Sequence, residues 1–219
     1  MAPRLPAAHA LTRLRRVTLE DDTVYTDGEI AESRFAGATA NKVTLERVVL
    51  RDVDLTGARL NKLVLTDVRL TNCDLANAVW RESTLDRVEV IGCRVTGLDL
   101  AEMSATSVVF RECTGSLAGF RFAALKRARF EECVLAEADF QNAVLSDVVF
   151  RGCDLKSAVF HGAQANGADL RGCTIDDMRI GPGDLAGAMI DPVQLVALAR
   201  TLAANQGIVV RALDDDALA

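Results

Sequence analysis

The sequence predicts an all-β solenoid in which each coil has four short sides, and three observations lead to this fold class. Apolar or small residues occupy every fifth position from Ile30 to Ile190 without an insertion. No proline lies between Pro6 and Pro182, as expected where backbone N–H groups are used in strand ladders. The six cysteines lie twenty residues apart. Since twenty is four times five, one coil contains four sides, and residues 31–190 should make about eight coils of 20 residues.

The five-residue period fits short strands and does not fit a helix. We call each position divisible by five a centre. On a helix, steps of five residues would carry the apolar stripe around the axis, so no single face would be apolar. In a strand, a centre and the residue two positions before it point the same way, and both positions hold apolar or small residues here. Gly, Asn or Asp often occupies the position two residues after the centre, where the chain must bend.

Four segments follow from the limits of this periodicity. Residues 1–24 form a basic N-terminal arm or cap, and residues 25–190 form the solenoid. Residues 191–210 form a C-terminal helix and short strand that serve as a cap or a dimerisation module, and residues 211–219 form a flexible acidic tail. In the arm, four apolar residues are placed to pack on the first coil: Leu11, Leu14, Val17 and Leu19.

The C-terminal segment carries the signals of a helix. Asp191 suits the N-cap, Pro192 suits the first helical position, and Gln194 completes a capping box. Gly207 is a stop signal, and residues 208–210 read as a short strand. The expected helix has an apolar stripe made of Leu195, Leu198, Ala199 and Leu202.

The repeats resemble those of the pentapeptide-repeat family. Its consensus is a small residue, Asp or Asn, Leu or Phe, a polar residue and often Gly, and residues 138–142, 153–157 and 168–172 match it closely. The resemblance implies a right-handed quadrilateral parallel β-helix with a C-terminal α-helical cap. One departure is Gly115, a centre without a side chain, where we expect a void or a local distortion. Two large residues occupy turn positions nearby, Leu117 and Phe122, and we expect them to fold over this deficit or to form a contact patch.

The C-terminal segment is similar to that of the fluoroquinolone-resistance members of the family, the MfpA and Qnr types. That similarity implies a homodimer formed through the terminal helix and strand, and the alternative is a monomeric cap. The candidate dimer contacts are Leu195, Leu198, Leu202, Ile208 and Val210.

The spacing of the cysteines indicates a packing role and argues against a metal site or disulfides. Side chains stacked one per coil cannot converge tetrahedrally on a zinc ion, and they lie too far apart and too parallel for disulfides. We therefore expect a buried column of free thiols, which agrees with a reducing compartment. The column consists of Cys73, Cys93, Cys113, Cys133, Cys153 and Cys173. Only two histidines occur, and no nucleophile has a plausible His–Asp set, so we expect no catalytic residues, no cofactor, no metal and no enzyme activity.

Charge supplies the main indication of function. The whole chain has a net charge of −6, and residues 31–190 contain 22 acidic and 19 basic residues. The side whose centres run from position 35 to position 175, which we call side A, carries the candidate partner face: Asp54, Asp74, Glu137, Asp154, Asp176 and Asp177. Three basic residues on the same side oppose them: Arg34, Arg94 and Lys156.

Two functional hypotheses remain at this stage. Similarity to the MfpA and Qnr types implies a non-catalytic DNA mimic that engages DNA gyrase or topoisomerase IV through an acidic side and modulates or protects the enzyme. The alternative is a structural scaffold for another protein–protein interaction. Both predict a protein partner and no direct nucleic acid binding. No stretch has the length of a membrane span or the apolar run of a signal peptide, so we expect no membrane association and a cytoplasmic location.

Overall fold

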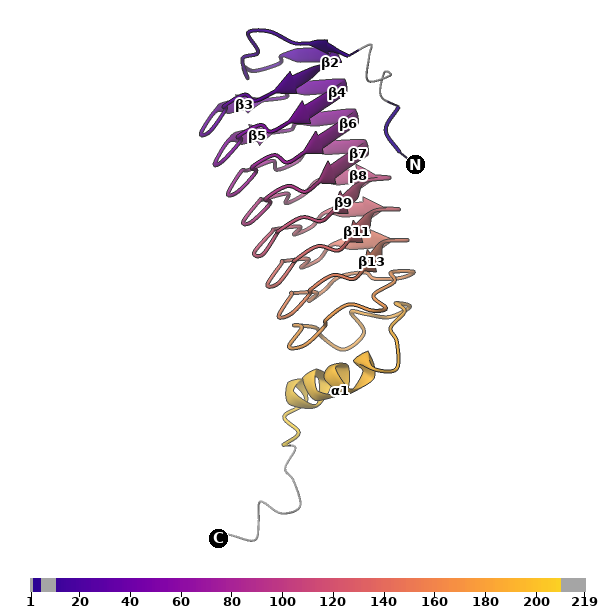
Figure 1. The fold of residues 1–219 in the computed structure, drawn as a ribbon. Helices are drawn as coiled ribbons and strands as arrows, with labels where there is room; N and C mark the ends of the chain where they lie inside the picture. Colours follow the sequence, from indigo (N-terminus) through magenta and orange to yellow (C-terminus); the bar gives the residue numbers. More distant parts are fainter. Residues whose placement is uncertain (1, 5–10, 210–219) are drawn as a thin grey trace.

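The computed structural model describes residues 2–4 and 11–209, and its coils stack into a rod (Figure 1). Within these residues, a single helix, α1 (Gln194–Asn205), lies across the C-terminal end. It is not long and apolar enough to cross a membrane. The strands are β1 (Thr12–Arg13), β2 (Val24–Ala31), β3 (Thr39–Asn41), β4 (Thr44–Arg51), β5 (Arg59–Asn61), β6 (Val64–Thr71), β7 (Thr84–Ile91), β8 (Ser104–Thr106), β9 (Val109–Arg111), β10 (Ala124–Lys126), β11 (Arg129–Glu131), β12 (Val144–Ser146) and β13 (Val149–Arg151).

The solenoid rises by twenty residues per turn, as the cysteine spacing predicts. From β2 onward, residues twenty positions apart pair in parallel, either between strands or as isolated bridges, for example Ile30 with Leu50 and Phe110 with Phe130. The ladder then continues as a bridge between positions 149 and 169. Positions 30 to 170 thus make about seven regular turns, and a bridge between Asp169 and Met189 carries the ladder into the eighth coil that the sequence predicts. Residues 181–187 form turns instead of another regular coil, and Pro182 in this stretch has no N–H to donate to a ladder.

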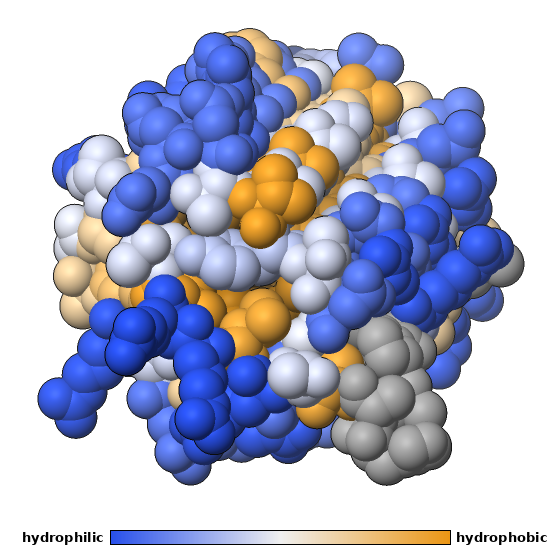
Figure 2. Space-filling view, turned by 90° about the horizontal axis from the view of Figure 1, so that it is seen from above, coloured by the Kyte–Doolittle hydropathy of each residue, from blue (hydrophilic) through white to orange (hydrophobic). Residues whose placement is uncertain are grey.

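The centres form the core, and they stack in columns along the rod. Figure 2, which looks along the rod from the end that is uppermost in Figure 1, shows apolar side chains toward the axis and hydrophilic ones around it. Phe130 is fully buried and lies parallel to Phe110, with ring centroids 5.1 Å apart, and to Phe150, with centroids 4.8 Å apart. It also meets Phe120 of the neighbouring column edge to face at 5.6 Å. Each ring therefore contacts others both along and across the core, in the geometries that aromatic pairs prefer.

The expected void at Gly115 is absent. A Cβ atom built at Gly115 would lie 2.7 Å from Cγ2 of Val95 and 3.1 Å from Cδ2 of Leu135, so these two neighbours in the column already fill the space. The ladder is also regular there, because the Gly115 N–H donates to the carbonyl oxygen of Val134 at 2.7 Å. The expectation was wrong because it kept the neighbouring side chains fixed, whereas side chains in a close-packed interior lean into available space. A small cavity of about 20 Å³ lies instead near the first coils, lined by residues that include Leu60 and Trp80.

Leu117 and Phe122 do not fold over Gly115. Leu117 is 58% exposed and Phe122 is 54% exposed, so neither side chain is buried against the core. Of the two roles considered from the sequence, covering the deficit at Gly115 is therefore excluded.

The N-terminal segment adds one more strand to the first coil. Thr12 of β1 pairs in parallel with Gly28 of β2. Gly28 is needed at this contact, since a Cβ there would lie 2.6 Å from Cγ of Leu14. Leu14, Val17 and Leu19 pack against the core, as predicted. The backbone N–H of Arg4 donates to Oδ1 of Asp67 at 2.8 Å, which ties the start of the chain to the third coil.

Helix α1 begins with the predicted capping box. Oδ1 of Asp191 accepts hydrogen bonds from the N–H groups of Val193 and Gln194, and Oε1 of Gln194 accepts one from the N–H of Asp191 at 2.9 Å. Oδ2 of Asp191 also accepts a hydrogen bond from the N–H of Gly172 at 2.8 Å. The side chain of Asp191 therefore links the helix to the last regular coil. It also accepts hydrogen bonds from N–H groups at the start of the helix, which have no partner within the helix.

The face that α1 packs on the solenoid differs from the predicted stripe. Ala197 and Leu198 pack against the core, and Gln194 is buried beside them. Leu195, Ala199 and Leu202 are exposed. Positions 194, 197, 198 and 201 follow the spacing of one helix face. The stripe was misassigned because Gln194, a polar residue, is at the centre of the buried face.

Gly207 ends the helix as predicted. Its φ is +70°, its N–H bonds to the carbonyl oxygen of Ala204, and the N–H of Ile208 bonds to that of Ala203 at 2.9 Å. These two hydrogen bonds form a Schellman motif. Residues 208 and 209 are not in a strand, which corrects the expected strand at 208–210. Val210 and the expected acidic tail at 211–219 lie outside the described residues.

Candidate functional site

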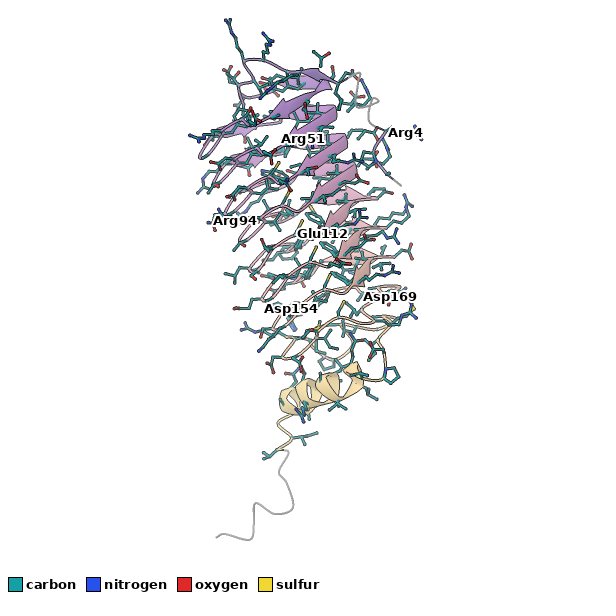
Figure 3. The ribbon with its side chains drawn as sticks, in the orientation of Figure 1. Arg4, Arg51, Arg94, Glu112, Asp154 and Asp169 are labelled. Carbon is teal, nitrogen blue, oxygen red and sulfur yellow. The ribbon has the colours of Figure 1, made fainter. Side chains whose placement is uncertain are left out.

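Side A brings the six predicted acidic residues into neighbouring columns along one side of the rod. Backbone bridges connect positions 34, 54, 74, 94, 114, 134, 154 and 174 in sequence, so side chains twenty residues apart are direct neighbours. Figure 3 labels Arg94 and Asp154, which lie along the same edge of the rod. The arrangement is a surface, not a cavity, and its properties depend on which carboxylates are free to meet a partner.

Three of these carboxylates are used within their own repeats. Oδ1 of Asp54 accepts a hydrogen bond from the N–H of Thr56 at 3.0 Å. Asp74 does the same with the N–H two residues later at 3.1 Å, and Asp154 with that of Lys156 at 3.0 Å. The bond is an Asx turn, in which the side chain supplies a partner to the bending backbone. The same contact is made at Asp99, Asp139 and Asp169, so the preference of the repeat for Asp at this position has a structural cause.

Asp74 is also neutralised by a cation. Its Oδ2 accepts hydrogen bonds from Nη2 of Arg94 at 2.5 Å and from Nε at 3.1 Å. Burial acts to raise the pKa of Asp74, but the bonds from Arg94 and from the Ala76 N–H outweigh it and leave the pKa below its usual value. The N-terminal half of side A therefore presents little free negative charge. Arg94 and Asp74 are neighbours because they lie twenty residues apart at one repeat position. Arg34 and Asp54 have the same relation and form no ion pair within the described residues, so the position alone does not decide the pairing.

The free carboxylates gather at the C-terminal end of side A. Glu137, Asp176 and Asp177 are exposed, and within residues 11–209 none has a Lys or Arg nitrogen within 4.0 Å. Glu137 and Asp177 occupy the same turn position two coils apart, with φ of +57° and +56°. We call Glu137, Asp176 and Asp177 the acidic cluster. It can attract a cationic surface without first breaking an ion pair.

An open groove borders the acidic cluster. It has a volume of about 720 Å³ and lies between the last coils and α1, with Asp176, Asp177, Arg179 and Arg200 among its lining residues. His161 lies on the same groove, and its Nδ1 is 3.6 Å from Oδ2 of Asp184. Within the described residues no group of three or more His, Cys, Asp or Glu side chains is placed to hold a metal ion.

The side whose centres run from position 50 to position 170 neutralises part of its own charge through ion pairs. Nε of Arg69 lies 2.7 Å from Oε2 of Glu89, and Nε of Arg111 lies 2.8 Å from Oε2 of Glu131, each pair joining adjacent coils. The pair formed by Arg171 and Asp169 lies within one coil, at 2.7 Å. Such pairs contribute little stability individually, but they cancel charge on this side. The neutralisation is incomplete, because the exposed Glu112 and Glu132 on this side form no ion pair within residues 11–209.

All six cysteines are buried and free. The thiol of Cys133 donates toward the carbonyl oxygens of Phe110 at 3.4 Å and Glu131 at 3.3 Å, and Cys113 makes the same pair of contacts one coil earlier. Interaction with the thiols of Cys113 and Cys153, together with burial, raises the pKa of Cys133. All six thiols are closed off from solvent, so the column serves packing and backbone hydrogen bonding.

The residues predicted to contact a second copy lie at the C-terminal end. Leu195, Leu202 and Ile208 are exposed, whereas Leu198 is partly buried against the solenoid. Val210 lies outside the described residues. Sequence reasoning did not identify the exposed Val193 and Val196, which lie on and beside the first turn of α1. Together these residues leave an apolar surface on the outer side of the cap.

Two family models match the solenoid. The one described as "Pentapeptide repeat region" matches residues 63–140 and 106–180, and the one described as "Pentapeptide repeats (8 copies)" matches residues 30–62. No curated protein matches the chain.

Several solved structures are similar to this one. Full-length QnrB1, a plasmid-mediated fluoroquinolone resistance protein, has a TM-score of 0.40 and 15% identity, covering 79% of this chain and 98% of its own. Rfr23 from the cyanobacterium Cyanothece 51142 has a TM-score of 0.24 and 13% identity, covering 78% and 91%. HetL from Nostoc sp. strain PCC 7120, a protein involved in heterocyst differentiation regulation, has a TM-score of 0.23 and 16% identity, covering 78% and 94%.

Proposed function

Since this chain belongs to the pentapeptide-repeat family, we propose that it is a non-catalytic binding protein whose acidic cluster engages a cationic surface of a partner protein. We propose further that the partner is a type II topoisomerase, either DNA gyrase or topoisomerase IV. The chain would then modulate the enzyme or protect it from inhibitors. The observation that carries the proposal is the exposure of Glu137, Asp176 and Asp177 without ion-pair partners in the described residues.

The physical argument is electrostatic. A protein surface that binds DNA carries Lys and Arg side chains that neutralise phosphates. Carboxylates on a rod can occupy the same positions and compete for the same cations. Glu137 and Asp177 are two coils apart, which is roughly 9–10 Å along the rod at the usual strand spacing. The two carboxylates thus lie on one edge of the rod, with Ser157 between them, and Asp176 adds a third negative charge beside Asp177.

We also propose that the protein forms a homodimer through the outer side of the cap. Leu195, Leu202 and Ile208 are exposed there, and apolar area of this kind favours association. The acidic cluster lies in the last regular coils, directly beside the cap. A dimer formed through the cap would bring the clusters of both copies toward its centre and lengthen the negative surface.

A scaffold for a different protein is the second candidate function. The pairing of Asp74 with Arg94 favours it, because it removes negative charge from the N-terminal half of side A. A topoisomerase partner needs only the C-terminal half to be acidic, whereas a DNA mimic extending along the whole rod needs both.

The proposal is tested with DNA gyrase and purified protein, by measuring supercoiling at increasing protein concentration with and without a fluoroquinolone. The variant Glu137→Lys/Asp177→Lys should lose inhibition or drug protection. The matched control is Glu112→Lys/Glu132→Lys. These two glutamates are also exposed, occupy the same turn position with φ of +53° and +54°, and undergo the same change of charge elsewhere on the rod.

Equal loss in both variants would show that net charge alone matters and would contradict a role for the acidic cluster. If the wild-type protein has no effect on gyrase or topoisomerase IV, the topoisomerase proposal fails and the scaffold remains. The dimer is tested separately by light scattering coupled to size-exclusion chromatography. Leu195→Asp should convert a dimer to a monomer, and a wild-type monomer would contradict the dimer proposal.

A further inference from the structure

Leu117 and Phe122 occupy backbone positions that the rest of the chain reserves for polar residues. Twenty-five non-glycine residues in the described chain have a positive φ, and the other twenty-three are charged or polar. Leu117 has a φ of +61° and Phe122 has a φ of +57°. This conformation strains residues with a Cβ, and Gly or Asn would occupy it at a lower cost. Neither side chain recovers that cost by burial, because more than half of each is exposed.

The two residues flank one side of a single coil, and of the two outward-facing positions between them one is a glycine and the other is Arg121, whose Nε lies 3.7 Å from Oδ2 of Asp139 in the next coil. Gly119 is the outward-facing residue next to Leu117, and it pairs with Asp99 in the coil before and with Asp139 in the coil after. The floor of the site is this position. Gly119 does not have a positive φ, and a Cβ there would meet its nearest atom, Oδ1 of Asp99, at 3.8 Å. Neither conformation nor space therefore requires a glycine. We call Leu117, Gly119 and Phe122 the apolar site.

Two unpaired glutamates border the apolar site, since the other two acidic residues near it, Asp99 and Asp139, are ion-paired with Arg81 and Arg121. Residues 97–102, 117–122 and 137–142 form this side over three coils, and they contain four acidic residues and one basic residue. The N–H of Glu102 donates a backbone hydrogen bond to the coil that contains Phe122. The N–H of Leu117 donates one to the coil that contains Glu137. Glu102 and Glu137 thus lie one coil away from the two apolar residues, and within residues 11–209 neither glutamate forms an ion pair.

We propose that the apolar site binds a segment of a partner protein that presents apolar side chains flanked by Lys or Arg. Leu117 and Phe122 would contact the apolar side chains on either side of the floor at Gly119. Glu102 and Glu137 would pair with the cations. These carboxylates disfavour a nucleic acid or another polyanion at this position. The inference does not depend on the partner of the acidic cluster being a topoisomerase.

The test measures the affinity of a fluorescein-labelled amphipathic helical peptide made only of leucine and lysine, at physiological salt, by fluorescence anisotropy. Leu117→Gly/Phe122→Gly should weaken binding by about tenfold or more, since two apolar contacts are lost. The same variant should keep or raise the thermal midpoint of the protein, because glycine relieves the backbone strain. Loss of binding without loss of stability separates a binding role from a structural one.

Gly119→Gln is the second variant. It should fold as the wild type does, because its Cβ has room. It should bind the leucine–lysine peptide more weakly, because the glutamine side chain blocks the floor. Val159→Gln, two coils later at the same repeat position, is the matched control and should bind normally. Val193→Ser/Val196→Ser should also bind normally, which excludes attraction to any exposed apolar surface. A lysine–serine peptide of equal length should bind at least about tenfold more weakly to the wild type.

Three outcomes would overturn the proposal. The first is equal affinity of the leucine–lysine peptide for the wild type and Leu117→Gly/Phe122→Gly. The second is equal affinity of the wild type for both peptides, which would mean that charge alone attracts them. The third is self-association of the wild type that disappears in Leu117→Gly/Phe122→Gly, since it would make a second copy of this chain the occupant.

Discussion

The side-chain amide of Gln194 donates to the carbonyl oxygen of Leu170 at 2.7 Å, across the boundary between helix α1 and the solenoid. The same amide nitrogen donates to the carbonyl oxygen of Cys173, also at 2.7 Å. Further along the helix, Nδ2 of Asn205 donates to the carbonyl oxygen of Ile180 at 2.6 Å. A solenoid ends in backbone groups that have no next coil to pair with. Here two amide side chains of the cap supply the missing donors, and Gln194 is buried as a result.

Gln194→Leu should destabilise the C-terminal coils. The substitution leaves the carbonyl oxygen of Cys173 without a donor, and that of Leu170 keeps only the N–H of Cys173 at 3.2 Å. A buried unsatisfied group costs roughly 1–3 kcal/mol. Thermal unfolding followed by circular dichroism should show a lower midpoint, and amide hydrogen exchange should accelerate first in residues 170–180. Gln206→Leu is the control, because Gln206 is exposed just after the helix. Equal effects of the two substitutions would contradict a capping role for Gln194.

Phe130→Ala should be among the most damaging single substitutions. Phe130 is fully buried and contacts rings in its own column and in the neighbouring one. Removing such a ring costs roughly 3–5 kcal/mol through lost burial and the cavity that remains. Phe122→Ala, at an exposed phenylalanine, should change the unfolding free energy by less than about 0.5 kcal/mol. Urea denaturation of both variants checks the inward placement of the centres, and Phe130→Ala with wild-type stability would contradict it.

The repeat made the fold predictable, because a five-residue period fixes which side chains point inward and a twenty-residue period fixes which ones stack. Capping was predictable in part. Asp191 and Gln194 were recognisable as a local capping box, but the bonds from Gln194 to Leu170 and Cys173 span more than twenty residues and require the coordinates. The acidic face was predictable as a set of residues on one side. Its division into paired and free carboxylates was not, since that depends on how the side chain of Arg94 reaches Asp74.

The cysteine column should be chemically silent in the folded protein. All six thiols are buried, and in Cys93 and Cys173 interaction with a neighbouring thiol together with burial raises the pKa. Reaction with a thiol reagent needs access as well as a thiolate, and burial withholds access from all six thiols. We expect almost no reaction of native protein with Ellman's reagent and six thiols titrated in guanidinium chloride. Rapid reaction of any thiol in the native state would show that its coil opens readily.

The last prediction concerns two ion pairs that share one geometry and differ in burial. Arg87 bonds both carboxylate oxygens of Asp67, at 2.7 and 2.8 Å, and Arg47 bonds both oxygens of Asp27, at 2.5 and 2.7 Å. The side chain of Asp67 is 9% exposed, whereas that of Asp27 is 50% exposed. Bonding to Arg87, aided by the Arg4 N–H, holds the pKa of Asp67 below its ordinary value despite burial. Bonding to Arg47 lowers the pKa of Asp27 in the same way.

Asp67→Asn should therefore lower the unfolding free energy by roughly 1.5–3 kcal/mol at neutral pH, the usual contribution of a hydrogen-bonded charge. A carboxylate whose folded pKa is depressed stabilises the protein above its unfolded pKa of about 3.9 and loses that contribution as pH falls through the folded pKa. The difference between wild type and Asp67→Asn should thus be constant from about pH 5 to pH 8 and should shrink below about pH 4. Asp27→Asn should have a smaller effect that added salt removes, because its pair is open to solvent. Denaturant titrations of the wild type and both variants over this pH range, at low and high salt, measure each loss of unfolding free energy and its dependence on pH and salt. Equal losses in the two variants would contradict burial as the cause, and a difference that grows below pH 4 would contradict the assigned direction of the Asp67 pKa.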